Sequence, residues 1–361
     1  MLSWVINDFL RCLKQTEPRE FKVVVMPDFF VDRFVRFSGS VNEFSKAIVE
    51  VAERRGGNIH GVKQMELRGG NAANTAAALA TLDVKVFPII TTDSLGFQLL
   101  QFYFSPLGVD LYHVKISGEA GLTTALELTN HKEKVNIMLG NVGSLQDFGP
   151  DDLTEEDFEL IADADYVCVF NWASTRSHGT ELAQKVFERV KESGKGKTYY
   201  DTGDPTPNKN AIPRLIKNVL KRDLVDIFSV NENEALQYAS RIDNKVRGLK
   251  RLNHLEMTKE CARTLAKQMS CRVDLHTSAF SGSFTQDNEV IVPTFTLYGL
   301  RSTGAGDSWN AGNIYGDAHK FPDSCRLTMA NAVAGYYVSS AAAQHPTLPQ
   351  LTEFCQKQQT S

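Results

Sequence analysis

The sequence predicts an α/β fold in which a mostly parallel β-sheet is covered by helices on both faces. Short apolar runs typical of buried strands occur at residues 23–25, 84–90, 166–170, 198–201 and 227–230. Segments with helical spacing alternate with them at residues 71–82, 95–104, 180–192, 232–241, 259–269 and 323–343. Because such alternation produces right-handed βαβ units, ligands are expected at the carboxyl ends of the strands.

Two segments interrupt the alternation and predict a small additional β-layer. Residues 123–129 and 134–139 read as a hairpin, and residues 31–37 and 58–67 as half-exposed strands on either side of a helix at 41–54. We expect one α/β domain over residues 1–361, with a discontinuous β lid from about residues 29–68 and 111–142. Closing such a lid would exclude water from the site beneath it.

Composition and charge favour a small-molecule ligand. The formal net charge is −4 and the basic residues are scattered, which argues against nucleic acid or a polybasic membrane surface. The six cysteines form no Cys-x-x-Cys pair, so a zinc site or a disulfide framework is not expected, and the cytoplasm is the expected compartment. The first twenty residues have the spacing of an amphipathic helix that caps the fold, without the unbroken apolar core of a signal peptide.

A glycine-rich turn at residues 301–312, after a strand-like segment at 290–297, carries the strongest chemical signal. Gly304, Ala305 and Gly306 precede Asp307 at the start of an expected helix, where unpaired N–H groups form an anion hole. Phosphoryl transfer needs positioning, charge stabilisation and a group that accepts the hydroxyl proton, and Asp307 suits the last role. The alternative is a tight turn in which Asp307 is only a first-turn helix carboxylate.

Two weaker patterns lie at other strand ends. Gly70 and Asn71 open an Ala-rich helix, and its amides together with the Asn74 side chain could bind ligand hydroxyls. Asn231 and Glu234 follow the strand at 227–230, where a carboxylate could hold Mg²⁺ through water. Taken alone, each pattern is more often a helix cap than a binding site.

Read together and in this order, these segments resemble the ribokinase family of carbohydrate kinases, also called the PfkB family, from about residue 23 to residue 349. Residues 69–74 are similar to the amino-proximal Gly-Gly signature of that family, residues 303–307 to its carboxyl-proximal signature, and residues 231–234 to its Asn-x-x-Glu element. The resemblance implies a ribokinase-like three-layer α/β/α fold with a β-sheet lid. It also implies ATP or ADP as the phosphoryl donor, with Mg²⁺.

The resemblance also assigns roles to single residues. Asp307 would be the base, and the amides of Ala305, Gly306 and Asp307 would bind the transferring phosphoryl group. Asp32, Gly70 and Asn74 fall at sugar contacts of the family, and Glu234 would hold magnesium through water. The positions implied for the nucleotide are Asn231, Thr277, Gly282 and Asn331.

Several positions depart from the family pattern and leave the substrate open. Asn71 replaces a lysine of some sugar kinases, and Asn171 falls where ribokinase-like members offer a glutamate to the sugar. Ala279 replaces the first glycine of the Thr-x-Gly-x-x-Gly segment. Arg301 stands where many members have an aspartate beside a monovalent-cation site, so we expect activity without potassium. The helix at 41–54 within the lid points to a divergent subgroup.

The expected activity is phosphorylation of a hydroxyl of a sugar, polyol or nucleoside. Arg68, Arg176 and His178 favour a nearby alternative, a kinase for a sugar phosphate such as ribose 1-phosphate, because a substrate phosphate favours cationic partners. A non-catalytic sugar or nucleotide sensor on the same fold is a further alternative, against which the retention of Asp307 argues. We expect a homodimer through the β lid, or a monomer if the helix at 41–54 covers the same face.

Overall fold

The computed structural model describes residues 2–130, 133–244, 246, 253–297, 299–300 and 303–359. Arg301 lies outside these residues. Within them, the main sheet has eight strands in the order β12-β11-β10-β9-β8-β7-β1-β4. The six strands from β10 to β4 in this order are parallel to one another, and β11 and β12 pair antiparallel at the other edge. The strands are β1 (Lys22–Met26), β4 (Lys85–Pro88), β7 (Tyr166–Phe170), β8 (Lys197–Asp201), β9 (Ile227–Val230), β10 (Arg272–His276), β11 (Phe280–Phe284) and β12 (Glu289–Pro293).

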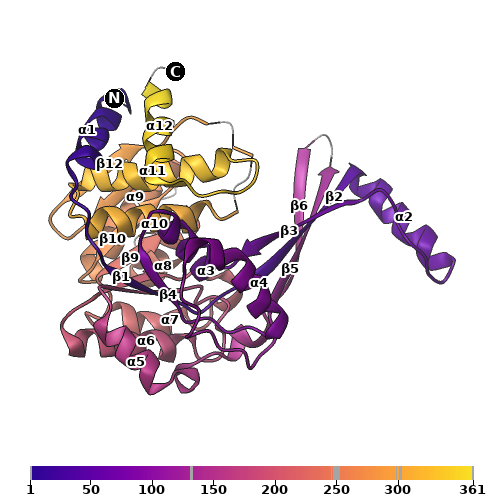
Figure 1. Ribbon diagram of the computed structural model, residues 1–361, viewed down its shortest axis with the longest axis horizontal. Helices are drawn as coiled ribbons and strands as arrows, with labels where there is room; N and C mark the ends of the chain where they lie inside the picture. Colours follow the sequence, from indigo (N-terminus) through magenta and orange to yellow (C-terminus); the bar gives the residue numbers. More distant parts are fainter. Residues whose placement is uncertain are drawn as a thin grey trace.

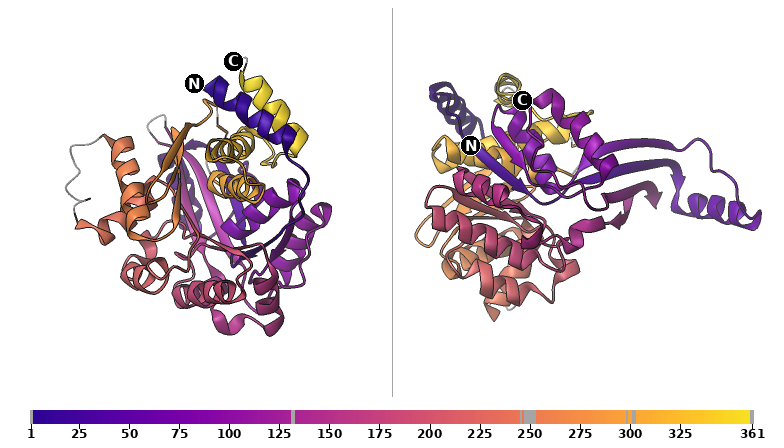
Figure 2. Two further views of the ribbon diagram at one scale, coloured as in Figure 1. Left: turned by 90° about the vertical axis from the view of Figure 1, so that its left-hand side faces the viewer. Right: turned by 60° about the horizontal axis from the view of Figure 1, so that its bottom comes forward.

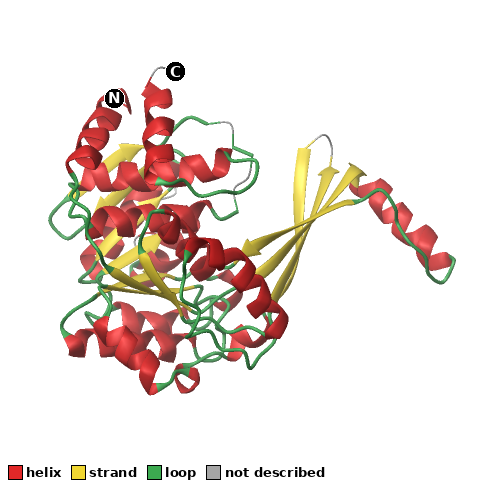
Figure 3. Ribbon diagram, viewed as in Figure 1, coloured by secondary structure: helices red, strands yellow, loops and turns green. Residues whose placement is uncertain are grey.

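Helices cover both faces of this sheet, which confirms the predicted three-layer α/β/α fold (Figures 1 and 3). One layer comprises α5 (Glu155–Asp163), α6 (Gly179–Ser193), α7 (Ile212–Leu215), α8 (Glu232–Ile242) and α9 (His254–Gln268). The other comprises α1 (Leu2–Gln15), α3 (Asn71–Thr81), α4 (Ser94–Phe104), α10 (Ala305–Ala318), α11 (Asp323–Ser339) and α12 (Leu348–Gln359). Alternate residues of each central strand face opposite layers, so Val24 packs in the first core and Val23 in the second.

The second sheet projects from one side of the body (Figures 1 and 2). Its strands β2 (Phe30–Ser40), β3 (Lys63–Gly69), β5 (Gly121–Asn130) and β6 (Glu133–Asn141) lie in the order β3-β2-β5-β6. The predicted small β-layer is therefore present, and it fits a lid. The strand expected at 58–67 begins only at Lys63, and the one expected at 290–297 ends at Pro293. Residues 58–62 and 294–297 are bends or irregular backbone instead of strand. The ends of strands are the part of an element that a sequence pattern predicts least well.

Helix α2 (Val41–Glu53) follows β2 directly and extends from the far end of the lid, away from the body (Figure 1). Its start is a capping box, in which the Ser40 hydroxyl accepts the Glu43 N–H and the Glu43 carboxylate accepts the Ser40 N–H. None of its residues is buried, and Ile48 and Val49 are exposed. The helix therefore does not cover the apolar face of the lid.

The expected amphipathic helix at the amino terminus is α1, which packs against α11 and α12 through Ile6, Phe9 and Leu10. The helix expected to reach residue 343 is α11, which ends at Ser339. No helix in the described ranges combines the length and the apolarity needed to cross a lipid bilayer.

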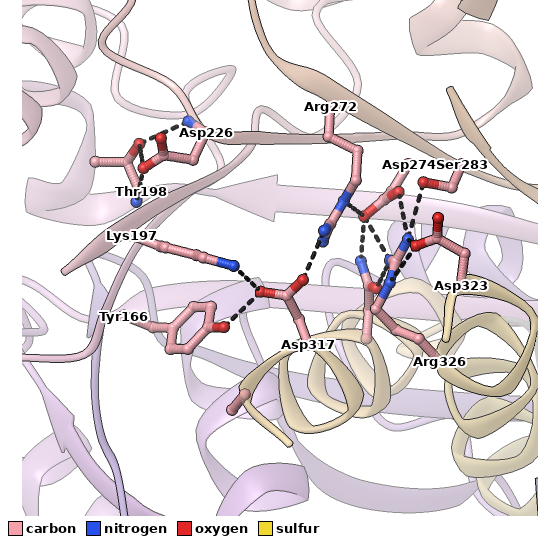
Figure 4. Close-up of polar contacts among 12 residues, drawn as sticks. Tyr166, Lys197, Thr198, Asp226, Arg272, Asp274, Ser283, Asp317, Asp323 and Arg326 are labelled. Carbon is pink, nitrogen blue, oxygen red and sulfur yellow. Dashed lines mark hydrogen bonds and ion pairs between the residues drawn. The ribbon is translucent and has the colours of Figure 1, made fainter. Parts of the chain in front are cut away.

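A buried ionic network ties α10 and α11 to the sheet (Figure 4). The Arg326 guanidinium of α11 donates hydrogen bonds to Asp274 of β10 at 2.8 Å and to Ser283 of β11 at 2.8 Å. It also donates to Asn313 of α10. Arg326 and Asp274 are almost fully buried, and the adjacent guanidinium groups hold the pKa of Asp274 below its usual range despite that burial. Because the glycine turn lies at the start of α10, this network also holds that turn in place relative to the sheet.

Candidate active site

The turn predicted to bind an anion lies at the start of α10. Gly304 caps this helix with φ 82°, in the left-handed region that favours glycine. A Cβ atom at Gly304 would lie 2.7 Å from the Tyr337 hydroxyl, so the missing side chain also makes room for that ring. The N–H groups of Ala305, Gly306 and Asp307 belong to the first turn, where a helix supplies no partner of its own. The helix dipole adds to these N–H groups, so the turn suits a bound anion.

Asp307 is buried in this first turn and faces α3. The Asn74 amide donates a hydrogen bond to its Oδ2 at 2.9 Å, and the Thr75 hydroxyl donates to its backbone carbonyl at 3.3 Å. Burial raises the pKa of Asp307 to about 8, and the Asn74 hydrogen bond only partly opposes this rise. The neighbouring carboxylates that raise the pKa further are Asp201, Asp28 and Asp32. A carboxylate with so high a pKa is a strong base for its type.

Asp28 joins the site, although no sequence pattern singled it out. Its buried carboxylate accepts N–H groups from Asn71 and Ala72, each at 2.8 Å, and from the Asn171 side chain at 2.8 Å. It thereby caps the start of α3 from the end of β1. Gly70 has φ 95°, and a Cβ atom there would lie 2.8 Å from a backbone atom of Phe29. The available signal was an acidic residue two positions after the end of a buried strand.

Asp32 lies on β2, where the lid meets the body. Burial raises the pKa of its carboxyl to about 6, although a hydrogen bond from Thr123 lowers it and the charge of Asp28 adds to the rise. A Cβ atom at Gly69 on the paired strand would lie 2.3 to 2.5 Å from the Asp32 carboxyl atoms. The first glycine of the Gly-Gly pair is therefore needed to accommodate Asp32.

A cavity of about 650 Å³ lies between the lid and the body. It is large enough for a sugar or a nucleoside. Asp32, Arg68 and Asn74 line it, and Asn74 connects it to Asp307. Its other lining residues are Phe34, Arg36, Phe37, Ser38, Met65, Leu67, Glu127, Leu128, Thr129, Asn136, Leu300, Thr303, Tyr337 and Ala341.

Arg68 brings a largely buried positive charge to this cavity. Its guanidinium lies 5.8 Å from the centre of the Tyr103 ring and 5.6 Å from that of Phe104, and its Nε donates to Asn74 Oδ1 at 3.3 Å. Burial lowers the pKa of Arg68 to about 10. In the part of the chain that the structure describes, no carboxylate makes an ion pair with this guanidinium, although the charge of Asp307 favours its protonated form.

A chain of hydrogen bonds connects Arg68 to the glycine turn. The guanidinium can only donate, so His345 Nε2 accepts from it at 3.1 Å and the imidazole proton is on Nδ1. That nitrogen lies 3.3 Å from the Ser308 hydroxyl, which donates to the carbonyl oxygen of Gly304 at 2.9 Å. Burial and the adjacent Arg68 hold the pKa of His345 well below its usual range, as a neutral acceptor requires. Arg68, which lines the cavity, is thus connected through His345 and Ser308 to the carbonyl oxygen of Gly304 in the anion-binding turn.

Asn231 and Glu234 form a reciprocal helix cap at the start of α8. Glu234 accepts the backbone and side-chain N–H groups of Asn231 at 2.9 and 2.7 Å, and its own backbone N–H donates to Asn231 Oδ1 at 3.0 Å. Burial and the nearby carboxylates of Asp201 and Asp204 raise the pKa of Glu234 well above its usual range. Among the described residues, no three His, Cys, Asp or Glu side chains are arranged to hold a metal ion directly. A single carboxylate here could hold Mg²⁺ only together with water and nucleotide phosphates, as magnesium is commonly held.

The other residues expected at the nucleotide cluster around β10, β11 and α11. The Thr277 hydroxyl accepts the Phe280 N–H at 2.9 Å within the turn that joins β10 to β11. Gly282 lies in β11. The buried Asn331 accepts from the Ser281 hydroxyl at 2.6 Å and from the Trp309 indole N–H at 3.0 Å. Thr277 and Asn331 therefore also have structural roles: Thr277 stabilises the β10–β11 turn, and Asn331 links α11 to β11 and α10.

Two further residues complete the comparison with the sequence-based expectations. Arg176 is exposed on the loop before α6, and it does not line the cavity that contains Asp32 and Arg68. Asp201 was not expected at the site, yet it accepts the Asn310 amide at 2.7 Å and so connects the carboxyl end of β8 to α10. Its position at the end of a buried strand was the signal that could have identified it.

The fold and the site define an α/β kinase with a β-sheet lid. The model of the pfkB family of carbohydrate kinases matches residues 39–351. The chain belongs to this family, and it is therefore a phosphotransferase.

The chain is similar to several kinases. It is 24% identical to the 5-dehydro-2-deoxygluconokinase of Geobacillus kaustophilus (strain HTA426) over 298 residues, which cover 80% of this chain and 84% of the relative. The adenosine kinase of Sinorhizobium meliloti superimposes with a TM-score of 0.69 at 17% identity, covering 94% and 99% of the two chains. The ribokinase of Arabidopsis thaliana, solved with ribose and ATP, gives 0.68 at 17% identity, covering 93% and 99%. At these identities the solved structures show the shared fold.

Proposed function

We propose that this kinase transfers the terminal phosphoryl group of a nucleotide, ATP or ADP, to a hydroxyl of a sugar, polyol or nucleoside. The observation that carries the proposal is the position of Asp307. A buried carboxyl group with a pKa raised to about 8 lies in the first turn of α10, and Asn74 connects it to the cavity under the lid. An acceptor in that cavity would have its hydroxyl between the proton acceptor and the anion-binding turn.

The acceptor side supplies orientation and the base. Asp32 and Asn74 would bind acceptor hydroxyls, since a carboxylate accepts and a side-chain amide both accepts and donates hydrogen bonds. Asp307 would take the proton of the reacting hydroxyl. The hydroxyl oxygen would form a bond to the terminal phosphorus, and the bond between that phosphorus and the bridging oxygen of the nucleotide would break. The lid would keep water, a competing acceptor, away from the phosphoryl group. Asn74 would hold the Asp307 carboxylate in place for this step.

The donor side supplies charge stabilisation. The N–H groups of Ala305, Gly306 and Asp307 would bind the oxygens of the transferring group, whose charge is spread over three positions. Glu234 would hold Mg²⁺ through water, with Asn231 positioning its carboxylate, and the ion would neutralise charge on the nucleotide phosphates. Thr277, Gly282 and Asn331 would border the nucleotide. We also place the protein in the cytoplasm, in keeping with its six free cysteines.

Arg68 favours a second class of acceptor, one that already carries a phosphate, such as ribose 1-phosphate. A largely buried guanidinium without an ion pair among the described residues is costly to keep, and an anionic substituent on the acceptor would supply a close counter-charge. Arg68 lines the same cavity as Asp32 and is hydrogen-bonded to Asn74 there.

A panel of acceptors assayed with MgATP and MgADP tests both classes. The panel should include free pentoses, hexoses, nucleosides and pentose phosphates, and transfer should be measured as the phosphorylated product. If the acceptor is anionic, Arg68→Met should lower kcat/KM for it by about 30- to 150-fold, because truncating one member of a buried charge pair costs about 2–3 kcal/mol. Neutral acceptors should lose much less.

Arg176→Met serves as the matched control in this panel, because it removes an arginine that does not line the cavity. A wild-type enzyme that phosphorylates only neutral acceptors would exclude the phosphorylated class. Absence of transfer to every acceptor with both nucleotides would argue against the kinase activity and for a sensor.

The lid also favours a homodimer. One face of the sheet exposes Leu122, Ile137 and Leu139, and α2 covers none of them. Apolar side chains gathered on one face of a sheet are unfavourable in water, so a second copy of the lid is the expected cover. Light scattering should therefore give twice the chain mass, and Leu139→Lys should shift the protein toward the monomer. A monomeric wild-type protein at assay concentrations would contradict this arrangement.

A further inference from the structure

His276 presents an unpaired polar atom beside the proposed anion hole. It is the last residue of β10, at the carboxyl edge of the sheet. Its Nε2 is buried and has no hydrogen-bond partner among the described residues. A buried polar atom without a hydrogen-bond partner destabilises a protein, because it has lost its hydrogen bonds to water and gained none. Such an atom in a native site therefore calls for a partner that is not part of the chain.

The imidazole lies against the first turn of α10. A Cβ atom at Gly306 would be 3.3 Å from His276 Cε1 and 3.9 Å from Nε2, so the ring edge occupies the space that a side chain there would need. The ring also packs on Trp309 at 5.0 Å between centroids, with an angle of 33° between the planes. Gly306 and Trp309 are three residues apart and share one face of the helix. Packing on two residues of one face fixes the ring relative to the anion hole.

This face of α10 is the donor side of the site. Asp307 turns toward Asn74 and α3, where the cavity for the acceptor lies. Trp309 instead donates to Ser281 and Asn331, next to the turn of Thr277. An anion bound at the first turn of α10 and extending over this face would meet His276.

A purely structural role explains the ring of His276 but not its nitrogen. A phenylalanine ring would stack on Trp309 and fill the space beside Gly306 equally well, without a buried polar atom. The neighbouring carboxylates of Asp201, Glu232 and Asp274 favour a protonated imidazole, yet none is hydrogen-bonded to it, and burial lowers its pKa.

We propose that His276 Nε2 donates a hydrogen bond to a phosphate oxygen of the donor nucleotide and thereby positions the phosphate chain over the first turn of α10. The inference rests on the proposed function, because it takes the turn at Gly304 as the phosphate site. His276 is a positioning residue: it accepts no proton from the acceptor, and no bond is made or broken at it.

His276→Phe and His276→Gln test this role as a pair. Phenylalanine keeps the ring and removes the N–H, so kcat/KM for MgATP or MgADP, whichever is the better donor, should fall by about 10- to 100-fold, the value of a hydrogen bond to a charged group. The KM for the acceptor should stay within about threefold. Glutamine places an N–H donor near the position of Nε2, so it should restore most of the lost kcat/KM.

Tyr200→Phe is the matched control. The Tyr200 hydroxyl is another buried polar atom without a partner in the described chain, but it lies in the opposite core, against Phe187 and Phe228. Its removal should leave the kinetics for both substrates unchanged within about twofold.

Several results would overturn the role of His276. Unchanged nucleotide kinetics in His276→Phe would do so, and so would equal losses in the phenylalanine and glutamine variants, which indicate packing alone. If His276→Phe does not fold, the imidazole nitrogen resonances of ¹⁵N-labelled wild-type protein decide the matter, assigned with His276→Gln. A nucleotide-dependent shift at Nε2 supports the contact, and its absence excludes it. Absence of phosphoryl transfer by the wild-type protein to every acceptor of the panel, with both nucleotides, would instead refute the proposed function.

Discussion

Asp307→Asn is expected to lower kcat by about 10²–10⁴-fold or more, because it removes the proton acceptor at nearly constant shape. The asparagine oxygen can still accept the Asn74 hydrogen bond that now holds Oδ2 at 2.9 Å. Binding of the acceptor and of the nucleotide should therefore change little. The measurement is the turnover of purified wild-type and variant protein with the acceptor that the panel identifies.

The pH dependence provides an independent check on the same residue. Only the ionised carboxylate can accept the proton, and its pKa is raised to about 8, so kcat/KM of the wild type should rise with pH to a plateau above about 8. The native protein retains a proton at Asp307 that the unfolded chain releases at about pH 4, so this residue lowers stability progressively as pH rises from about 4 to 8.

Asparagine has no such titration. Above pH 8 the variant should be at least as stable as the wild type, so lost turnover cannot be attributed to unfolding. An Asp307→Asn enzyme with near-normal kcat, or a kcat/KM that does not change between pH 6 and pH 9, would remove Asp307 from the role of base.

Arg326→Met is expected to lower the free energy of unfolding by about 3–5 kcal/mol, because it removes one of the two guanidinium groups that pair with the buried Asp274 carboxylate. Arg326 and Asp274 are 1% and 0% exposed, and Arg326 contacts groups on β10, β11 and α10 (Figure 4). Arg272 still donates to Asp274 at 3.0 Å, which limits the loss. Urea unfolding at pH 7 measures the change.

Arg263→Met is the surface counterpart of this variant. Arg263 makes a two-pronged ion pair with Glu289 at 2.6 and 3.0 Å, and both side chains are partly exposed. Exposed ion pairs contribute about 0–1 kcal/mol, so this loss should be small. Equal decreases in the free energy of unfolding of the two variants would show that the buried Arg326 network contributes no more to stability than an exposed ion pair.

The sequence alone predicted much of the fold because its signals are short-range. The runs at residues 166–170 and 227–230 are β7 and β9, and the Ala-rich segment is α3. Alternation of strands and helices was sufficient for the three layers, because such units connect with one handedness. The small β-layer was predictable from hairpin and alternation patterns, but its strand order was not, since β2 pairs with β5 across the whole of α2, β3, α3, β4 and α4.

The candidate site divides in the same way. Glycine turns leading into helices pointed to Asp307 and Asn74 from local pattern alone, and the resemblance to a kinase family added Asp32. Arg176 came from charge alone, and the structure places it away from the cavity. Residue type indicates that a side chain could bind an anion, but not which way its backbone directs it.

Local sequence determined the elements of this protein and the anion-binding turn, because helix starts, glycine conformations and apolar periodicity are properties of a few adjacent residues. Only the tertiary structure decided which polar groups share the site. Asn74 reaches Asp307 across 233 residues of sequence, and Arg68 reaches His345 across 277. Burial, which raises the pKa of Asp307 and leaves His276 Nε2 without a partner, is a property of the packed layers, so no pattern along the chain could reveal it.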